Sequence, residues 1–180
     1  MANCRIRIYV TCDANGNPIP SELGHFDLQF DGNYTIDGRA FTNPVFSYVP
    51  GSGNCGLIKV FNAARTAAVF ADKKFKAYTF SFSANNVTDV IAQIGSYLNA
   101  GHGAYITSNA YQYNVISGPF VTYDLSSTNC FAATATFASW LGYNTLRQIY
   151  KDAGTNYQSY SAYNMWRQYG GAWEYHGFYG

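Results

Sequence analysis

Cys130 and the residues around it form the stretch of the chain best suited to chemistry. Ser126-Ser-Thr-Asn129 precedes it with side chains that cap helices, and apolar residues at helical spacing follow, at Phe131, Ala135, Ala138 and Leu141. This pattern predicts a helix that starts at Cys130. Because helix N-termini favour negative charge, we expect the thiol to ionise more easily than a free one and to act as a nucleophile. The alternative is a small apolar residue under the first turn.

A nucleophilic cysteine needs a base, and His25 is the first candidate. In Gly24-His-Phe-Asp-Leu-Gln-Phe30 apolar and polar residues alternate, so Phe26, Leu28 and Phe30 share one face of a strand and His25 lies on the other. His25 is then either a solvated surface residue or a base that faces a groove. His102 lies between two glycines and fits a loop, and His176 has no pattern that supports a catalytic role.

The segments between these residues predict the elements that position them. Further strands are expected at 5–11, 34–36, 45–49, 59–61, 77–83 and 121–125, and those up to residue 50 suggest an antiparallel meander. Apolar spacing predicts one clear amphipathic helix over 87–98, a last helix between Asn144 and Gly154, and a short one near 63–71. The expected fold is α+β, an antiparallel sheet packed against a few helices.

Length and composition narrow the class of protein. A chain of 180 residues predicts one domain, here residues 1–180. Its net charge is +1, only 12% of its residues are charged, and the Lys and Arg residues are scattered along the chain. These features argue against a surface that binds nucleic acid. No segment is apolar for 18 residues and the N-terminus lacks a signal-peptide pattern, so we expect a soluble chain without a transmembrane segment that, if exported, uses another route.

The cysteines and the aromatic residues bear on cofactors and contacts. Cys4, Cys12, Cys55 and Cys130 match no paired zinc pattern, and no metal or other cofactor is expected. In one strand, Cys4 and Cys12 would lie roughly 26 Å apart, too far for a disulfide. The aromatic-rich C-terminal segment, 157–180, is expected to pack over the sheet; alternatively it stacks against sugars.

The order of these motifs resembles that of the circularly permuted papain-like cysteine hydrolases, which are related to NlpC-type peptidoglycan peptidases. In that group the histidine strand precedes the cysteine helix. The residues that carry the likeness lie between about 20 and 142, in Gly24-His25, Phe46-Ser-Tyr-Val-Pro50, Tyr78–Ser83 with the helix to Leu98, and Tyr123-Asp-Leu125 with Asn129-Cys130.

The resemblance implies a role for each site residue. Cys130 is the nucleophile and His25 the base; Asp37 and Ser47 are candidates for the third residue that holds the imidazole. Tyr123 and Asn129 would support the oxyanion or the helix end, together with backbone N–H groups at the start of the Cys130 helix.

The implied reaction is thiol-mediated hydrolysis of an amide. The first substrate class is a peptidoglycan peptide, which suggests an antibacterial effector of the type VI secretion kind, delivered to the periplasm of a target cell and matched by an immunity protein; otherwise the chain is cytoplasmic. A second enzymatic possibility is a lipid acyltransferase or thioesterase of the permuted family. The alternative from another class is a binding or structural module of a phage or surface assembly, in which Cys130 is unreactive.

Overall fold

The alternating segments of the sequence assemble into one eight-stranded sheet. The computed structural model describes residues 1–179, and the strand order in this sheet is β10-β7-β1-β2-β5-β6-β9-β8, with every neighbouring pair antiparallel. The strands are β1 (Ala2–Thr11), β2 (His25–Phe30), β5 (Pro44–Pro50), β6 (Gly56–Asn62), β7 (Phe75–Ala84), β8 (Ala104–Thr107), β9 (Ala110–Asn114) and β10 (Glu174–Tyr179). A separate hairpin joins β3 (Asn33–Ile36) and β4 (Arg39–Thr42).

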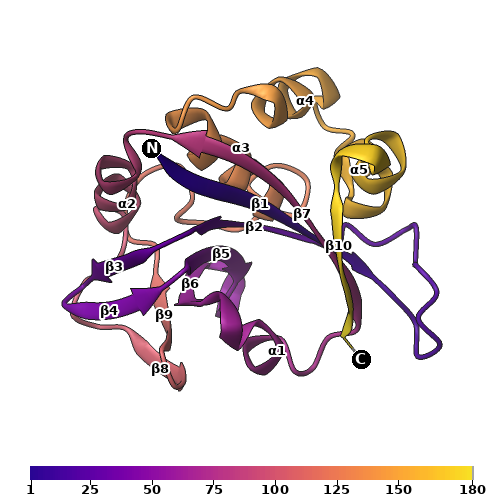
Figure 1. Ribbon diagram of the computed structural model, residues 1–180. Coiled ribbons are helices and arrows are strands. Elements are labelled where there is room, and N and C mark those ends of the chain that lie inside the picture. Colours follow the sequence, from indigo (N-terminus) through magenta and orange to yellow (C-terminus); the bar gives the residue numbers. More distant parts are fainter. Residues whose placement is uncertain (180) are drawn as a thin grey trace.

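Four helices cover one face of the sheet and one short helix lies on the other (Figure 1). The helices are α1 (Thr66–Val69), α2 (Val87–Gly95), α3 (Cys130–Trp140), α4 (Thr145–Ala153) and α5 (Ala162–Gln168). Buried residues of α2, α3, α4 and α5 join one hydrophobic cluster, and Val69 of α1 joins the second. The architecture is therefore α+β, as expected.

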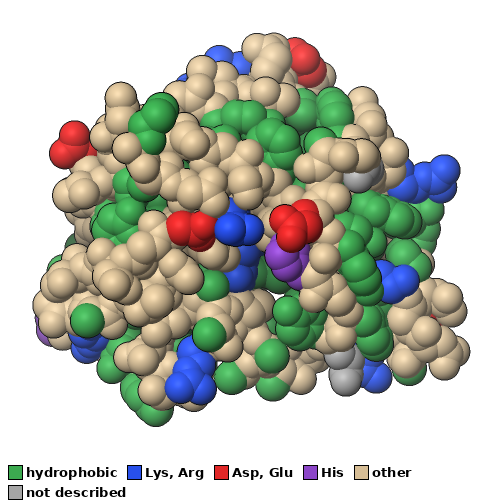
Figure 2. Space-filling model, viewed as in Figure 1, with side chains coloured by type: hydrophobic (Ala, Val, Ile, Leu, Met, Phe, Trp, Pro, Cys, Tyr) green, Lys and Arg blue, Asp and Glu red, His purple; other side chains and the backbone are tan. Residues whose placement is uncertain are grey.

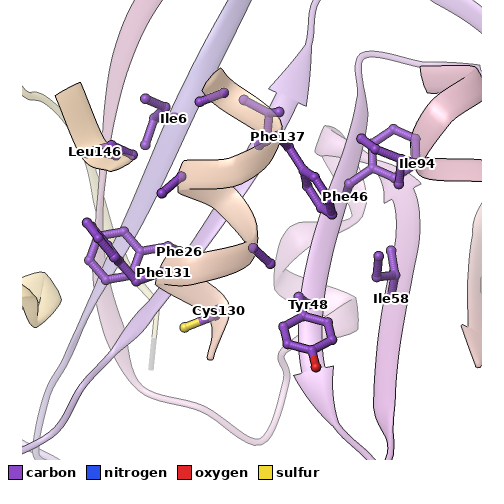
Figure 3. Packing of buried hydrophobic residues seen from close by; sticks show 14 of the residues in the cluster. Ile6, Phe26, Phe46, Tyr48, Ile58, Ile94, Cys130, Phe131, Phe137 and Leu146 are labelled. Carbon is purple, nitrogen blue, oxygen red and sulfur yellow. The ribbon is translucent and has the colours of Figure 1, made fainter. Parts of the chain in front are cut away.

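Helix α3 is the central element of the larger cluster. Its first residues pack on β2, where the Phe26 and Phe131 rings meet edge to face with centroids 4.9 Å apart (Figure 3). The sequence predicted one apolar face, but eight of its residues from Cys130 to Ala138 are buried. The helix is buried on several sides because it packs against α4 and α2 as well as the sheet, and its many alanines allow this close approach.

Two other expectations need correction. The segment 121–125, expected as a strand, forms only an isolated bridge between Thr122 and Cys55. The meander expected up to residue 50 is interrupted, because β1, β2 and β5 are neighbours while β3 and β4 form their own hairpin.

The aromatic C-terminal segment was expected to pack over the sheet, and α5 does so, but residues 174–179 instead join the sheet as its edge strand β10. Gly180 lies outside the described residues. β10 extends the sheet beside β7, and Trp166 stacks on Tyr78 with centroids 5.7 Å apart. Tyr157, Tyr163 and Trp173 also pack against the larger cluster.

Candidate functional site

The first residue of α3 is Cys130, as the sequence predicted. Asn129 precedes it in an extended conformation, and its side-chain oxygen accepts a 2.9 Å hydrogen bond from the Ala132 N–H, an N-cap. Its Nδ2 donates to the Leu125 carbonyl and to the Tyr160 hydroxyl. Both ends of the buried Asn129 amide are therefore occupied by the helix cap and its surroundings, which makes Asn129 a support for the helix end.

The thiol occupies a place where the sheet opens. The ladder between β2 and β5 joins Leu28 to Phe46 and Gln29 to Val45, so it stops short of Phe26. The Cys130 Sγ lies 4.0 Å from the Gly24 carbonyl oxygen, and Figure 3 shows it at the end of α3, between Phe26 of β2 and Tyr48 of β5. The thiol thus lies against the backbone on either side of His25.

Burial dominates the ionisation of this thiol. It raises the pKa of Cys130 to about 11, while hydrogen bonding from the Phe26 N–H, the Tyr123 side chain and the Phe131 N–H acts in the opposite direction. The side chain is only 1% exposed. The expectation of easier ionisation was therefore wrong: removal from water outweighs the favourable helix end, and the resting group is a neutral thiol.

The His25 ring projects to the other side of β2, away from α3. It stacks on Tyr9, with centroids 5.5 Å apart, and packs near Phe70. Its Nε2 is 2.5 Å from the Ser47 Oγ on β5. Of the candidate third residues, Ser47 is thus the one in contact with the imidazole. Among the hydrogen bonds within residues 1–179, none joins this ring to the Cys130 thiol.

A buried polar network lies beside the imidazole on the same face. Asp27 accepts hydrogen bonds from Arg7 Nε at 2.6 Å and from the Tyr9 hydroxyl at 2.9 Å, and its Oδ2 is 3.9 Å from His25 Nε2. Burial lowers the pKa of His25 to about 4, although the negative charge of Asp27 acts in the opposite direction. The imidazole is therefore neutral at neutral pH, and it keeps 19% of its side chain exposed.

A cleft of about 1390 Å³ opens beside these groups. Gly24, His25 and Tyr123 line it, together with apolar side chains that include Leu57 and Phe70. Since Gly24 and Tyr123 also contact Cys130, the thiol lies directly beneath the cleft wall. Tyr123 therefore both lines the cleft and contacts the Cys130 thiol.

Tyr123 is positioned by a neighbour that the sequence reasoning did not single out. The Tyr48 hydroxyl donates to the carbonyl oxygens of Phe120 and Thr122, at 2.8 and 3.1 Å, and its ring packs on Tyr123. The Tyr123 backbone N–H donates to Asn54. The only available signal for Tyr48 was its position two residues before Pro50 in the motif that ends the β5 strand.

The remaining predicted residues lie elsewhere. Asp37 is in the turn between β3 and β4, where it accepts hydrogen bonds from Tyr113, Arg39 and the Gly101 N–H, so the structure does not bring it to His25. His102 is exposed in a turn, as expected, and the exposed His176 on β10 is 2.8 Å from the Thr79 hydroxyl.

The described residues show neither a strongly charged patch on the face shown in Figure 2 nor a metal-ligand cluster. On the face seen in Figure 2, acidic and basic side chains are scattered singly or in mixed groups. Within residues 1–179, no cluster of three or more His, Cys, Asp or Glu side chains is arranged to hold a metal ion. In the same range, the helices are too short or too polar to cross a bilayer.

Cys4, Cys12, Cys55 and Cys130 are all free thiols. Comparisons of the chain with protein-family models, with curated proteins and with solved structures found no match.

Proposed function

We propose that the chain is a cysteine hydrolase of amide bonds, with a permuted papain-like arrangement in which Cys130 is the nucleophile and His25 the base. The observation that carries the proposal is the convergence at one opening of the sheet: the thiol at the start of α3 lies against the backbone on both sides of His25, beneath a cleft that His25 lines. A thiol nucleophile and a histidine base are the two groups that this kind of covalent catalysis uses.

Ser47 is proposed as the residue that positions the imidazole. Because its hydroxyl contacts His25 Nε2, the other ring nitrogen, Nδ1, stays free to accept a proton. Asp27 lies 3.9 Å from Nε2 and would stabilise the imidazolium that forms during the reaction. Productive geometry requires the imidazole to turn toward the thiol when substrate enters, as catalytic contacts often tighten only in the complex.

The proposed reaction begins with both groups neutral. The Cys130 sulfur adds to the carbonyl carbon as its proton passes to His25, so an S–C bond forms and the carbonyl oxygen becomes negative. The Tyr123 hydroxyl and backbone N–H groups near the thiol would stabilise that oxyanion. His25 then protonates the amine as the C–N bond breaks, and water hydrolyses the resulting thioester.

The substrate class and location belong to this proposal as well. A peptide amide of peptidoglycan is the first candidate, which would make the chain an antibacterial effector acting in the periplasm of a target cell. The test is incubation of purified peptidoglycan with the wild-type protein and with the Cys130→Ala variant, with released fragments identified by mass spectrometry. The proposal requires new amine-terminated fragments with the wild type alone; the same fragments from both proteins would reject it.

One observation favours a second candidate function, a binding module that uses the cleft without catalysis. The thiol is buried and its pKa is raised, as in cysteines that serve only packing. Under this alternative, Cys130→Ala retains binding to peptidoglycan and neither protein releases fragments, so the same experiment, with a sedimentation assay added, separates the two functions.

A further inference from the structure

Lys59 is a partly buried cation in the cleft wall. Among residues 1–179, six charged residues line the cleft, and five of them, Glu22, Asp72, Lys73, Lys74 and Asp124, are exposed. Lys59 alone is partly buried. Among residues 1–179, no carboxylate lies within 4 Å of its amino group, whereas Lys73 contacts Asp72 at 3.8 Å.

The position of Lys59 ties it to the candidate catalytic residues. It lies on β6 directly opposite Ser47 of β5, and Ser47 contacts the His25 ring. Its positive charge is close enough to contribute to the lowered pKa of His25. The amino group lies 5.2 Å from the centroid of the Phe70 ring, which also packs near His25. Lys59 and His25 therefore share one end of the cleft.

A partly buried ammonium group has lost part of its hydration, and burial lowers the pKa of Lys59. Its remaining negative neighbour, Asp72, is exposed and already paired with Lys73. A carboxylate entering the cleft would restore a charge-assisted hydrogen bond in a setting less screened than the open surface. The site thus suits an anionic group on the ligand.

We propose that Lys59 binds a free carboxylate of the substrate, on the amine side of the bond to be cleaved. This inference rests on the proposed function, in which His25 protonates the departing amine. Because Lys59 lies at the His25 end of the cleft, the carboxylate it binds belongs to the leaving amino acid. The substrate class is therefore an acylated amino acid or a peptide cut next to its C-terminal residue.

A binding measurement tests the proposed role of Lys59 without requiring turnover. N-acetylalanine and its neutral isostere N-acetylalanine amide are titrated into ¹⁵N-labelled Cys130→Ala protein, and the affinities are read from chemical shifts. We expect the carboxylate to bind about tenfold more tightly than the amide, a preference that weakens with added salt. Lys59→Met should abolish the preference and Lys59→Arg should retain it, while Lys74→Met, which removes an exposed cleft lysine, should leave it unchanged.

Equal affinities for the two probes, or a preference that survives in Lys59→Met, would overturn the inference. Hydrolysis of N-acetylalanine by the wild-type protein is measured separately. A carboxylate preference, with neither hydrolysis of N-acetylalanine nor release of peptidoglycan fragments, would remove the proposed catalytic function and leave the Lys59 site in place. Hydrolysis without a carboxylate preference would remove the Lys59 site and leave the proposed catalytic function in place.

Discussion

The protonation states of Cys130 and His25 determine which mechanism the proposed hydrolysis would follow. Burial raises the pKa of the thiol to about 11 and lowers that of the imidazole to about 4, so both are neutral over the whole range between. This differs from a preformed thiolate and imidazolium pair. In the proposed reaction, proton transfer would then accompany attack on the carbonyl, as in general-base catalysis.

This charge state predicts the pH dependence of the reaction. The value of kcat/KM should stay nearly constant from about pH 6 to 9, because His25 remains an unprotonated base and Cys130 a protonated thiol across that range. The measurement is kcat/KM for an amide substrate in buffers of constant ionic strength. A steep rise through this range, with the slope of a single ionisation, would instead show that a small thiolate fraction carries the reaction.

Tyr123 carries the hydroxyl that is proposed as the side-chain donor to the oxyanion. Its side chain faces the thiol from the cleft side, so Tyr123→Phe removes a hydrogen-bond donor while keeping the ring that packs on Tyr48. We expect kcat to fall about 100-fold with KM little changed, as when one oxyanion donor is lost. Tyr157→Phe, at another tyrosine of the cleft wall, is the matched control and should retain full kcat. A full kcat in Tyr123→Phe would exclude its oxyanion role.

The turn before β2 determines where the strand that carries His25 begins. Gly24 has a φ of 72°, and a Cβ there would collide with the Tyr9 carbonyl oxygen and lie 2.7 Å from the Ala162 Cβ. The Leu23 carbonyl also accepts a 2.8 Å hydrogen bond from the Ala162 N–H. The approach of α5 to this turn therefore requires a residue without a side chain.

Gly24→Ala should consequently lower the free energy of unfolding by about 3 kcal/mol or more, from both the positive φ and the collision. Gly38→Ala is the control, because its φ is 71° but nothing lies within 4 Å of the added Cβ. It should cost only about 1 kcal/mol. Urea unfolding of both variants measures the difference, and equal losses would mean that the contact with α5 does not constrain the turn.

Local patterns predicted most elements because each carries a periodic signal. The alternation after Gly24 predicted β2 and the face of the strand on which His25 lies. The apolar spacing from Val87 predicted α2, whose buried residues are Val87, Val90, Ile91 and Ile94. The prediction of a strand at 121–125 was wrong. The backbone of this segment forms hydrogen bonds with Tyr48 and with residues 54–56, which are distant in sequence. Local propensity does not report such contacts.

The candidate site was less predictable than the elements. Cys130 and His25 had signals in capping and alternation, but the thiol's raised pKa arises from burial by several elements together. Asp37 and Ser47 looked equivalent in sequence; the separate β3–β4 hairpin carries Asp37 elsewhere, whereas β5 brings Ser47 to the imidazole. No sequence pattern marked Lys59 as a site residue, because its position opposite Ser47 depends on the pairing of β5 with β6.

The buried His25 imidazole links the stability of the folded chain to pH. The pKa of His25 is about 4 in the folded chain against 6.5 for an ordinary histidine, so between these values the unfolded chain binds more protons. The stability that the neutral His25 contributes is fully present above pH 6.5 and is lost as the pH falls toward 4. The free energy of unfolding should drop by about 2–3 kcal/mol over this range from His25 alone.

Replacement of His25 by glutamine removes the titrating imidazole and so tests this contribution. Urea unfolding at pH 7, 5.5 and 4.5 should show a smaller acid loss in His25→Gln than in the wild type. His102→Gln, at an exposed turn residue, should match the wild type. An unchanged acid loss in His25→Gln would mean that the imidazole is not held neutral by the fold.

The most direct test of Cys130 as a nucleophile activated by His25 uses a second cysteine of the same molecule as its reference. Cys4 and Cys130 are both buried, at 0% and 1% exposure, and each has a pKa of about 11. The protein is treated with p-nitrophenyl acetate at pH 7.5 and quenched in acid, and acetylation of each thiol is measured by peptide mass spectrometry.

We predict that Cys130 is acetylated at least about tenfold faster than Cys4, and that His25→Ala removes this advantage. Equal rates at the two thiols, or a Cys130 rate unaffected by His25→Ala, would contradict catalysis by this pair.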